Sequence, residues 1–380
     1  MKIRTPPLSL YIHIPWCVRK CPYCDFNSHA GQPDEETYVE ALLADLASET
    51  SGVSDRSVSS IFLGGGTPSL FSAGAIDRIL AAVQENLQLA DDVEITLEAN
   101  PGTVDAGHFA GYRTAGVNRL SIGVQSFDDT MLQRLGRIHS AKQAHEAFRV
   151  ARAAGFDNIN LDLMYGLPGQ STGMAVDDLR QAIDLAPEHL SWYQLTLEPN
   201  TAFRAEPPAA MPGEDLLGEI AESGVQLLAG EEYLQYEVSA YTKAGSQCRH
   251  NLNYWQFGDY IGIGAGAHAK LTVAEDGVMR RRKERHPGRY MERALAGSAL
   301  SGEDRLQDED LLMEFMLNVL RLNEGVPAGW FEQRTGLSLA AIGQRLALAR
   351  AQGLLDKDES RIRPTALGRQ YLNNLLLLFS

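Results

Sequence analysis

The sequence contains few cysteines and no long apolar run, and both shortages limit the class of protein. Only four of its 380 residues are cysteine, too few for the disulfide framework that stabilises small secreted domains. The most hydrophobic run, Leu375–Phe379, is far shorter than the roughly 20 residues that cross a bilayer. The N-terminal residues also lack the apolar core of a signal peptide. A reducing, cytoplasmic location is therefore expected.

Positive charge is scarce as well. Lys and Arg total 34 against 49 Asp and Glu, which gives a formal net charge of −15. Binding to nucleic acid needs a cationic face that neutralises phosphates, so nucleic acid is not expected as a partner. The length and the ordinary composition predict a globular protein with one large and one smaller domain.

The first half of the chain alternates short apolar runs with amphipathic helical stretches. This rhythm predicts an α/β fold with a parallel sheet and crossover helices. Six repeats rather than eight predict an open, partial (β/α)6 barrel, whose active-site residues would follow the strands. The predicted strands are Leu8–Ile14, Val58–Leu63, Val93–Ala99, Arg119–Val124, Asn158–Met164 and His189–Leu197.

The C-terminal part shows a different, mainly helical pattern. Helices are predicted over Leu311–Leu322, Ala340–Ala351 and Pro364–Leu378, with a short hairpin over Gly353–Arg363. This order predicts a small winged-helix-like domain. The predicted parts are a barrel over residues 1–237, a connecting segment over 238–305 and a helical domain over 306–380.

Three of the four cysteines form one constellation directly after the first strand, Cys17-x-x-x-Cys21-x-x-Cys24. Thiolates are soft ligands for iron–sulfur clusters or zinc. Three thiolates would leave one iron of a [4Fe–4S] cluster open for the amino and carboxylate groups of S-adenosylmethionine (SAM). The alternative is a structural zinc ion with Cys248 or His13 as fourth ligand, although zinc sites usually pair their cysteines in two separate C-x-x-C units.

The loops after the next strands resemble those of the radical SAM superfamily. Gly64-Gly65-Gly66-Thr67-Pro68 ends the second strand, and glycines let the backbone approach a ligand closely. Taken alone, Asp162 would also serve as a helix cap and Arg137 as a surface residue. The SAM contacts that the resemblance implies are Tyr11, Tyr23, Gly65, Gly66, Thr67, Glu98, Gln125, Arg137 and Asp162.

Longer segments resemble the HemN-like branch of that superfamily, which contains oxygen-independent coproporphyrinogen III dehydrogenases and haem chaperones. They are YIHIPWCVRKCPYCDF, IFLGGGTPS, EANPG, GVQSF, LDLMYGLPGQ and LSWYQLTLEPNT. Phe26 stands where the dehydrogenases carry a further cysteine, and only ten residues precede Tyr11, where they have an N-terminal extension. The segment from His250 to Trp255 matches the HNxxYW motif of the chaperones.

The resemblance therefore implies a haem chaperone, with haem as its cargo and respiratory apo-haem proteins, some of them membrane-associated, as acceptors. It also implies an electron donor for the cluster and a homodimer. Oxidative decarboxylation of coproporphyrinogen III is the alternative function, and the sequence assigns no catalytic residue. The haem contacts that the resemblance implies are His250, Asn251, Tyr254 and Trp255.

Three readings stay open in this region. His250 is equally expected as a hydrogen-bonded histidine within an aromatic core. Cys248 is expected as a free thiol or a haem-pocket residue. The basic run from Arg281 to His286 would pair with haem propionates or form a solvated surface segment.

Overall fold

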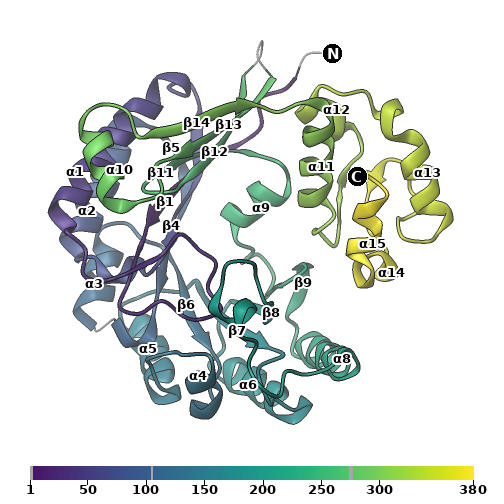
Figure 1. The fold of residues 1–380 in the computed structure, drawn as a ribbon, viewed down its shortest axis with the longest axis horizontal. Coiled ribbons are helices and arrows are strands. Elements are labelled where there is room, and N and C mark those ends of the chain that lie inside the picture. The colour runs from purple at the N-terminus through teal and green to yellow at the C-terminus, as the bar shows by residue number, and fades with distance from the viewer. Residues whose placement is uncertain (1–2, 104–105, 274–276) are drawn as a thin grey trace.

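The computed structural model describes residues 3–103, 106–273 and 277–380. Six parallel strands lie side by side in the order β1, β4, β5, β6, β7 and β8. They curve into an open barrel (Figure 1), which confirms the predicted fold class. Their bounds are β1 Leu8–Ile14, β4 Ser57–Gly65, β5 Gln88–Ala99, β6 Arg119–Gln125, β7 Ile159–Tyr165 and β8 His189–Gln194.

Each barrel strand alternates apolar and polar side chains, because successive residues face opposite sides of a sheet. In β1, Leu8, Leu10 and Ile12 belong to the buried core, which they share with apolar side chains of the surrounding helices. The intervening Ser9 and Tyr11 face the barrel interior, where Ser9 shares a hydrogen bond with Ser60 of β4. The barrel is therefore apolar outside, under its helices, and polar inside.

The helices between these strands, together with α7 and α8 after β8, lie around the outside of the barrel (Figure 1). Several begin at a serine whose hydroxyl accepts a hydrogen bond from a backbone N–H of the first turn, as at Ser72, Ser140 and Ser171; this satisfies a donor that the helix itself leaves free. Their bounds are α1 Glu35–Glu49, α2 Ala73–Asn86, α3 Ala106–Thr114, α4 Asp129–Arg134, α5 Ala141–Ala153, α6 Thr172–Asp184, α7 Ala202–Ala205 and α8 Glu214–Gly230.

The sheet continues past both ends of the predicted barrel and holds twelve strands among the described residues. The sequence prediction missed these strands, since their residues are polar or glycine-rich and lack the apolar runs of the barrel strands. β11 pairs with β1 in parallel, and three antiparallel strands follow it. The added elements are β9 Leu234–Glu237, β10 Ala240–Thr242, α9 Arg249–Trp255, β11 Asp259–Ile263, β12 His268–Val273, β13 Gly277–Lys283, α10 Pro287–Leu295 and β14 Leu300–Arg305.

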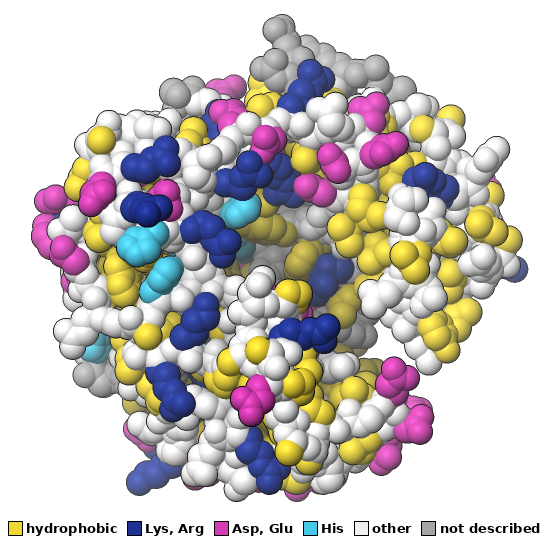
Figure 2. Space-filling view, viewed as in Figure 1, with side chains coloured by type: hydrophobic (Ala, Val, Ile, Leu, Met, Phe, Trp, Pro, Cys, Tyr) yellow, Lys and Arg dark blue, Asp and Glu magenta, His cyan; other side chains and the backbone are white. Residues whose placement is uncertain are grey.

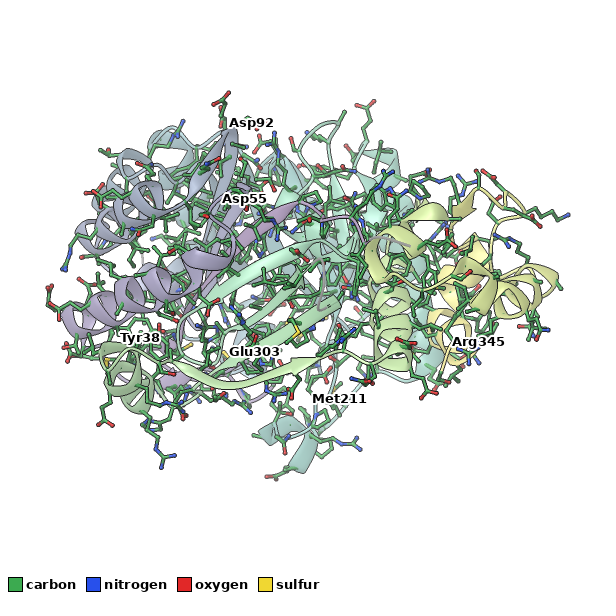
Figure 3. All side chains as sticks on the ribbon, turned by 90° about the horizontal axis from the view of Figure 1, so that it is seen from above. Tyr38, Asp55, Asp92, Met211, Glu303 and Arg345 are labelled. Carbon is green, nitrogen blue, oxygen red and sulfur yellow. The ribbon has the colours of Figure 1, made fainter. Side chains whose placement is uncertain are left out.

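The C-terminal helices form a second apolar core beside the barrel, around Phe315, Met316 and Phe331. Figure 3 shows these helices, with Arg345, at the opposite end of the molecule from α1 and Tyr38. The predicted last helix is divided at Tyr371, and β16 pairs with β15. The bounds are α11 Asp308–Val319, β15 Val326–Pro327, α12 Gly329–Thr335, α13 Gly343–Ala351, β16 Arg361–Ile362, α14 Ala366–Gln370 and α15 Leu372–Leu377.

The predicted division at residues 237/238 and 305/306 stays a prediction. The first core contains barrel residues together with Ile261 and Tyr290, whereas the second includes Phe257 and Val278. The predicted connecting segment, residues 238–305, thus contributes side chains to both cores. None of the helices in the described ranges has the length and apolarity that crossing a membrane requires.

Candidate functional site

The three clustered cysteines lie in one loop at the C-terminal end of β1. Cys17 ends the short strand β2 (Trp16–Cys17), which pairs with β3 (His29–Ala30) and so closes the loop. All three thiols are half-buried. The Thr67 hydroxyl donates to the sulfur of Cys17 over 3.5 Å, and a guanidinium N–H of Arg137 donates to that of Cys21 over 3.7 Å.

The chemistry of this donor set fits an iron–sulfur cluster. Burial raises the pKa of the Cys17 thiol, and the neighbouring Cys24 and Cys21 raise it further. Thiolates this close repel one another, and bound metal supplies the positive charge that offsets the repulsion. Within the described ranges, no group of three His, Cys, Asp or Glu side chains is placed to hold a single metal ion. A cubane instead gives each thiolate its own iron.

Neither candidate for a fourth zinc ligand faces the loop with a free atom. The His13 ring bonds to the Tyr11 hydroxyl over 3.0 Å through Nδ1 and to the Asn27 carbonyl over 2.9 Å through Nε2. Cys248 is buried and donates to the Glu94 carboxylate over 3.7 Å, in the half of the barrel where the strands begin. The structure thus gives zinc no further support.

The glycine-rich loop after β4 packs directly under the cysteine loop. A Cβ on Gly66 would lie 2.5 Å from the carbonyl oxygen of Trp16, which is backbone and cannot move aside easily. Gly65 has a φ of 116°, a conformation that favours glycine, and the His13 ring lies against it. The backbone N–H of Thr67 donates to the Trp16 carbonyl over 2.8 Å. These glycines bring the two loops together.

Two carboxyl groups stand inside the barrel beneath these loops. Glu98 of β5 accepts a hydrogen bond from the Gly65 N–H over 3.1 Å. Desolvation and the nearby Asp162 raise its pKa to about 8. Asp162 of β7 accepts hydrogen bonds from Ser121 over 3.0 Å and Asn160 over 2.8 Å, and desolvation raises its pKa too. The two carboxyl groups therefore disfavour carrying two negative charges together and would favour a cationic ligand.

Gln125 on β6, between β5 and β7, and Arg137 in the segment after α4 complete the mouth of the barrel. Gln125, the last residue of β6, is buried and has a φ of 68°, a strained backbone for a residue other than glycine. Its side-chain oxygen accepts a hydrogen bond from the Tyr193 hydroxyl over 2.8 Å. Arg137 donates to the Gly123 carbonyl over 2.8 Å as well as to Cys21, so it is no surface residue.

The two predicted tyrosines lie on either side of the mouth. The Tyr11 ring stands between those of Phe62 and His250, with centroids 6.3 and 6.2 Å away. Tyr23, inside the cysteine loop, lies against Phe203, and the neighbouring Arg137 opposes the rise that burial causes in its pKa. All nine residues predicted for SAM thus lie on β1, β4, β5, β6 and β7, with Tyr11 and Asp162 at mid-strand, or in the segments above these strands. Their role as SAM contacts stays a prediction.

Sequence reasoning missed Tyr193, which the structure places among them. Its hydroxyl bonds to Gln125, and Asp162, Tyr23 and Arg137 all influence its pKa, which desolvation raises well above the ordinary value. The signal was available, because Tyr193 is an inward-facing position near the end of the sixth barrel strand.

The HNxxYW segment forms α9, which plugs the lower half of the barrel. The Glu94 carboxylate accepts hydrogen bonds from the backbone N–H groups of Arg249 and His250, over 3.1 and 3.3 Å, and so satisfies donors at the start of the helix. His250 is buried, its Nδ1 lies 3.3 Å from the Ser60 hydroxyl, and burial lowers its pKa to about 3. Its surroundings are those of a hydrogen-bonded histidine among aromatic rings.

The other residues predicted for haem point in different directions from this helix. Tyr254 stacks on Tyr260 of β11 with ring centroids 4.1 Å apart. Trp255 turns toward the C-terminal core, where the Arg321 guanidinium lies 4.3 Å from its ring centroid. Asn251 is half-buried. Their role as haem contacts stays a prediction.

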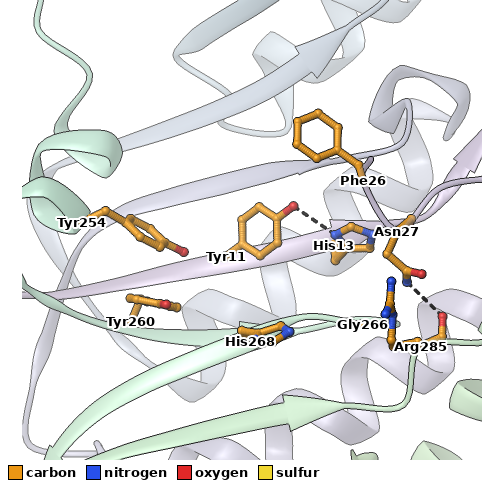
Figure 4. Close-up of a pocket in the computed structure, with 9 residues that line it drawn as sticks. All are labelled: Tyr11, His13, Phe26, Asn27, Tyr254, Tyr260, Gly266, His268 and Arg285. Carbon is orange, nitrogen blue, oxygen red and sulfur yellow. Dashed lines mark hydrogen bonds between the residues drawn. The ribbon is translucent and has the colours of Figure 1, made fainter. Parts of the chain in front are cut away.

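A cavity of about 360 Å³ opens between the cysteine loop, α9 and the strands added beside β1. Figure 4 shows aromatic rings and two histidines around it. Its lining includes Tyr254 but not His250. The lining residues are Tyr11, His13, Phe26, Asn27, Tyr254, Tyr260, Gly266, His268 and Arg285.

Two family models match the chain. Residues 11–182 match the radical SAM superfamily, and residues 306–371 match the HemN C-terminal domain. The structure also superposes on coproporphyrinogen III oxidase (HemN) from Escherichia coli, a radical SAM enzyme. The TM-score is 0.82 at 25% identity, over 99% of this chain and 90% of that one.

Curated relatives are similar over the whole length. The haem chaperone HemW of Escherichia coli is 51% identical, covering 99% of both chains, and that of Haemophilus influenzae is 50% identical, covering 99% of this chain and 98% of its own. A mitochondrial radical S-adenosyl methionine domain-containing protein 1 of Bos taurus is 35% identical, covering 97% of this chain and 86% of its own. The chain therefore belongs to the HemW family of radical SAM proteins.

Proposed function

We propose that this protein binds haem and delivers it to acceptor haem proteins while it carries a SAM-bound [4Fe–4S] cluster. The observation that carries the proposal is the 50% identity, over nearly the whole chain, to a protein named as a haem chaperone. Membership of the radical SAM superfamily implies the cluster and SAM. Decarboxylation of coproporphyrinogen III is the second candidate, because the fold superposes on HemN.

Cys17, Cys21 and Cys24 would hold the cluster, which supplies an electron to SAM when both are bound. The N–H that Arg137 donates to the Cys21 sulfur would stabilise the negative charge of the coordinated thiolate, since hydrogen bonds to sulfur tune such clusters. Thr67 would do the same for Cys17.

The remaining residues of the mouth would orient SAM. With a pKa of about 8, Glu98 would hold its proton at neutral pH when no cation lies beside it. A bound sulfonium cation would favour the carboxylate and release that proton. Gln125 and Asp162 present fixed amide and carboxyl groups on adjacent strands, while Tyr11, Tyr23, Gly65 and Gly66 would shape the pocket.

Haem would bind beside the cluster, where Tyr254 of the predicted haem motif lines the cavity. His250, Asn251 and Trp255 do not line the cavity, and they would hold α9, and with it Tyr254, in place. We further propose a cytoplasmic location, a cytoplasmic electron donor for the cluster, a homodimer, and respiratory haem proteins as acceptors.

The test is a haem titration of anaerobically reconstituted protein, followed by absorption spectroscopy, with coproporphyrinogen III and SAM assayed in parallel. We expect saturable binding of one haem per chain and no porphyrinogen turnover. Turnover without saturable haem binding would contradict the proposal and make the chain a decarboxylase.

A further inference from the structure

The cavity beside the cysteine loop combines aromatic rings with an imidazole and a guanidinium that have no side-chain partner among the described residues. In Figure 4, Tyr254 and Tyr260 lie at one end of the cavity, Phe26 and Arg285 lie toward the other end, and His268 lies between them. Figure 2 shows the same place as a hollow at the centre of this face, with basic and histidine side chains on its rim and apolar side chains inside.

His268 differs from His13 and His250 in having no hydrogen bond to its ring among the described residues. Both ring nitrogens of His13, the second imidazole in the cavity, are bonded, and desolvation lowers the pKa of His13 to about 4. His250 is bonded to Ser60 beneath Tyr254. The exposed His268 ring thus offers a nitrogen lone pair to a ligand in the cavity.

The His268 imidazole is also kept neutral. Desolvation lowers its pKa, and Arg280, Arg282 and Arg285 lower it further. Neutral imidazole is the form that binds a metal ion, and histidine is a common axial ligand of haem iron.

Arg285 is the one arginine of the basic run whose guanidinium makes no ion pair among the described residues. Arg281 pairs with Glu49 and Glu303, and Arg282 with Asp304. The Arg285 side chain instead lines the cavity, while its backbone carbonyl accepts a hydrogen bond from Asn27 over 2.9 Å. A guanidinium suits a carboxylate, which it can bind through two parallel hydrogen bonds.

The aromatic wall supplies a flat apolar surface. Tyr254 and Tyr260 stack with an interplanar angle of 27°. Phe26, two residues beyond Cys24, is 62% exposed, although a large apolar side chain gains by burial. A planar macrocycle would cover Phe26 and lie against the tyrosine pair.

Building on the proposed function, we infer that haem sits in this cavity with His268 on its iron, Arg285 on a propionate and Phe26 against the ring. The cavity is open to solvent at the mouth of the barrel (Figure 2), so one edge of the macrocycle would stay accessible to an acceptor. The iron ligand would therefore come from β12 and not from the HNxxYW helix, which builds the wall behind the ring.

The test is a titration with haem and with iron-free protoporphyrin IX of the reconstituted full chain and three variants, His268→Ala, Arg285→Ala and His286→Ala. We expect His268→Ala to shift the Soret band and weaken haem binding at least about tenfold, to leave protoporphyrin binding unchanged, and to recover the original band when imidazole is added. Arg285→Ala should weaken both ligands about fivefold, the upper range for an exposed ion pair.

His286→Ala is the matched control, because it is an exposed histidine of the same segment that does not line the cavity; it should bind like the parent. If the parent binds haem but His268→Ala keeps its Soret band and affinity, or if only His250→Ala changes the band, this inference is overturned and the proposed function stands. If the parent itself shows no saturable haem binding, the proposed function fails, and this inference with it.

Discussion

The mouth and the lower half of the barrel both contain cysteine, histidine and carboxyl side chains, but the surroundings of these side chains differ between the two halves. At the lower end, Glu94 accepts hydrogen bonds from Cys248 and from the backbone at the start of the plugging helix α9. His250 bonds to Ser60, and His189 bonds to Tyr236. At the mouth, Glu98 holds a proton it would normally lose and Gln125 has a strained backbone. Shifted pKa values occur in both halves, since burial also lowers the pKa of His250 to about 3. Only the mouth combines two neighbouring carboxyl groups of raised pKa with a strained backbone, and functional sites often concentrate such strain. We therefore expect ligand binding at the mouth and structural support at the lower end.

The largest expected contrast is between the cysteines of the two halves. Cys17→Ala, Cys21→Ala and Cys24→Ala should each abolish the cluster absorbance after anaerobic reconstitution, because a cubane held by two thiolates is poorly retained. Cys248→Ser should keep it, since this thiol contacts Glu94 in the lower half. An intact spectrum in any of the first three, or a bleached one in the fourth, would contradict the assignment.

The next largest expected contrast is between the contributions of His250 and His268 to the free energy of unfolding. His250→Ala removes a buried ring, 5.0 Å from that of Phe62 and hydrogen-bonded to Ser60, and should lower the free energy of unfolding by about 2–4 kcal/mol. His268→Ala changes an exposed side chain and should alter it by less than about 0.5 kcal/mol. Denaturant titration of both variants measures the difference, and equal effects would break the comparison.

The shifted carboxyl at the mouth predicts a pH dependence. The folded-state pKa of Glu98 is raised to about 8, so between its unfolded value near 4.5 and pH 8 the folded state binds more protons. Stability must therefore fall as pH rises through this window, by up to about 1.4 kcal/mol per pH unit. Glu98→Gln should remove this part of the slope. Denaturation of the parent and of Glu98→Gln at pH 6, 7 and 8 gives the dependence of the unfolding free energy on pH for each. Equal slopes for the two proteins would contradict the prediction.

Gln125 at the mouth is expected to affect ligand binding more than stability. Gln125→Gly relieves the positive φ, worth about 1–2 kcal/mol, but loses the hydrogen bond from Tyr193, worth about 1 kcal/mol, so the net change should lie within about 1 kcal/mol. SAM affinity, measured by calorimetry, should nevertheless fall about tenfold. Unchanged SAM affinity would remove Gln125 from the site.

The sequence predicts the barrel well because its six strands carry a strong periodic signal. Their inward positions alternate polar residues such as Ser121 and Asp162 with the apolar outward face, a pattern that also points to Tyr193. β11–β14 escaped prediction, since Arg280, Arg281 and Arg282 make β13 look like a solvated segment. These arginines are paired in the fold with Glu314, Glu49 and Asp304, which come from other parts of the chain.

The cysteine loop was equally predictable, because three thiols within eight residues are a local signal. The position of His250 was not, since nothing within the HNxxYW segment reveals that Glu94 and Ser60 draw it into the barrel. The same holds for His268 and Arg285, which come near Phe26 only through the pairing of β11 with β1.

The central claim, that this protein hands haem to acceptors, is tested most directly by following transfer from the haem-loaded chain. Absorbance would record the rate of haem appearance in an apo-haem protein of the respiratory chain at increasing acceptor concentration, with apomyoglobin as a passive scavenger for comparison. A rate that rises with the respiratory acceptor and exceeds the scavenger's plateau is predicted. A rate that stays at that plateau for every acceptor concentration would show simple dissociation and contradict the account.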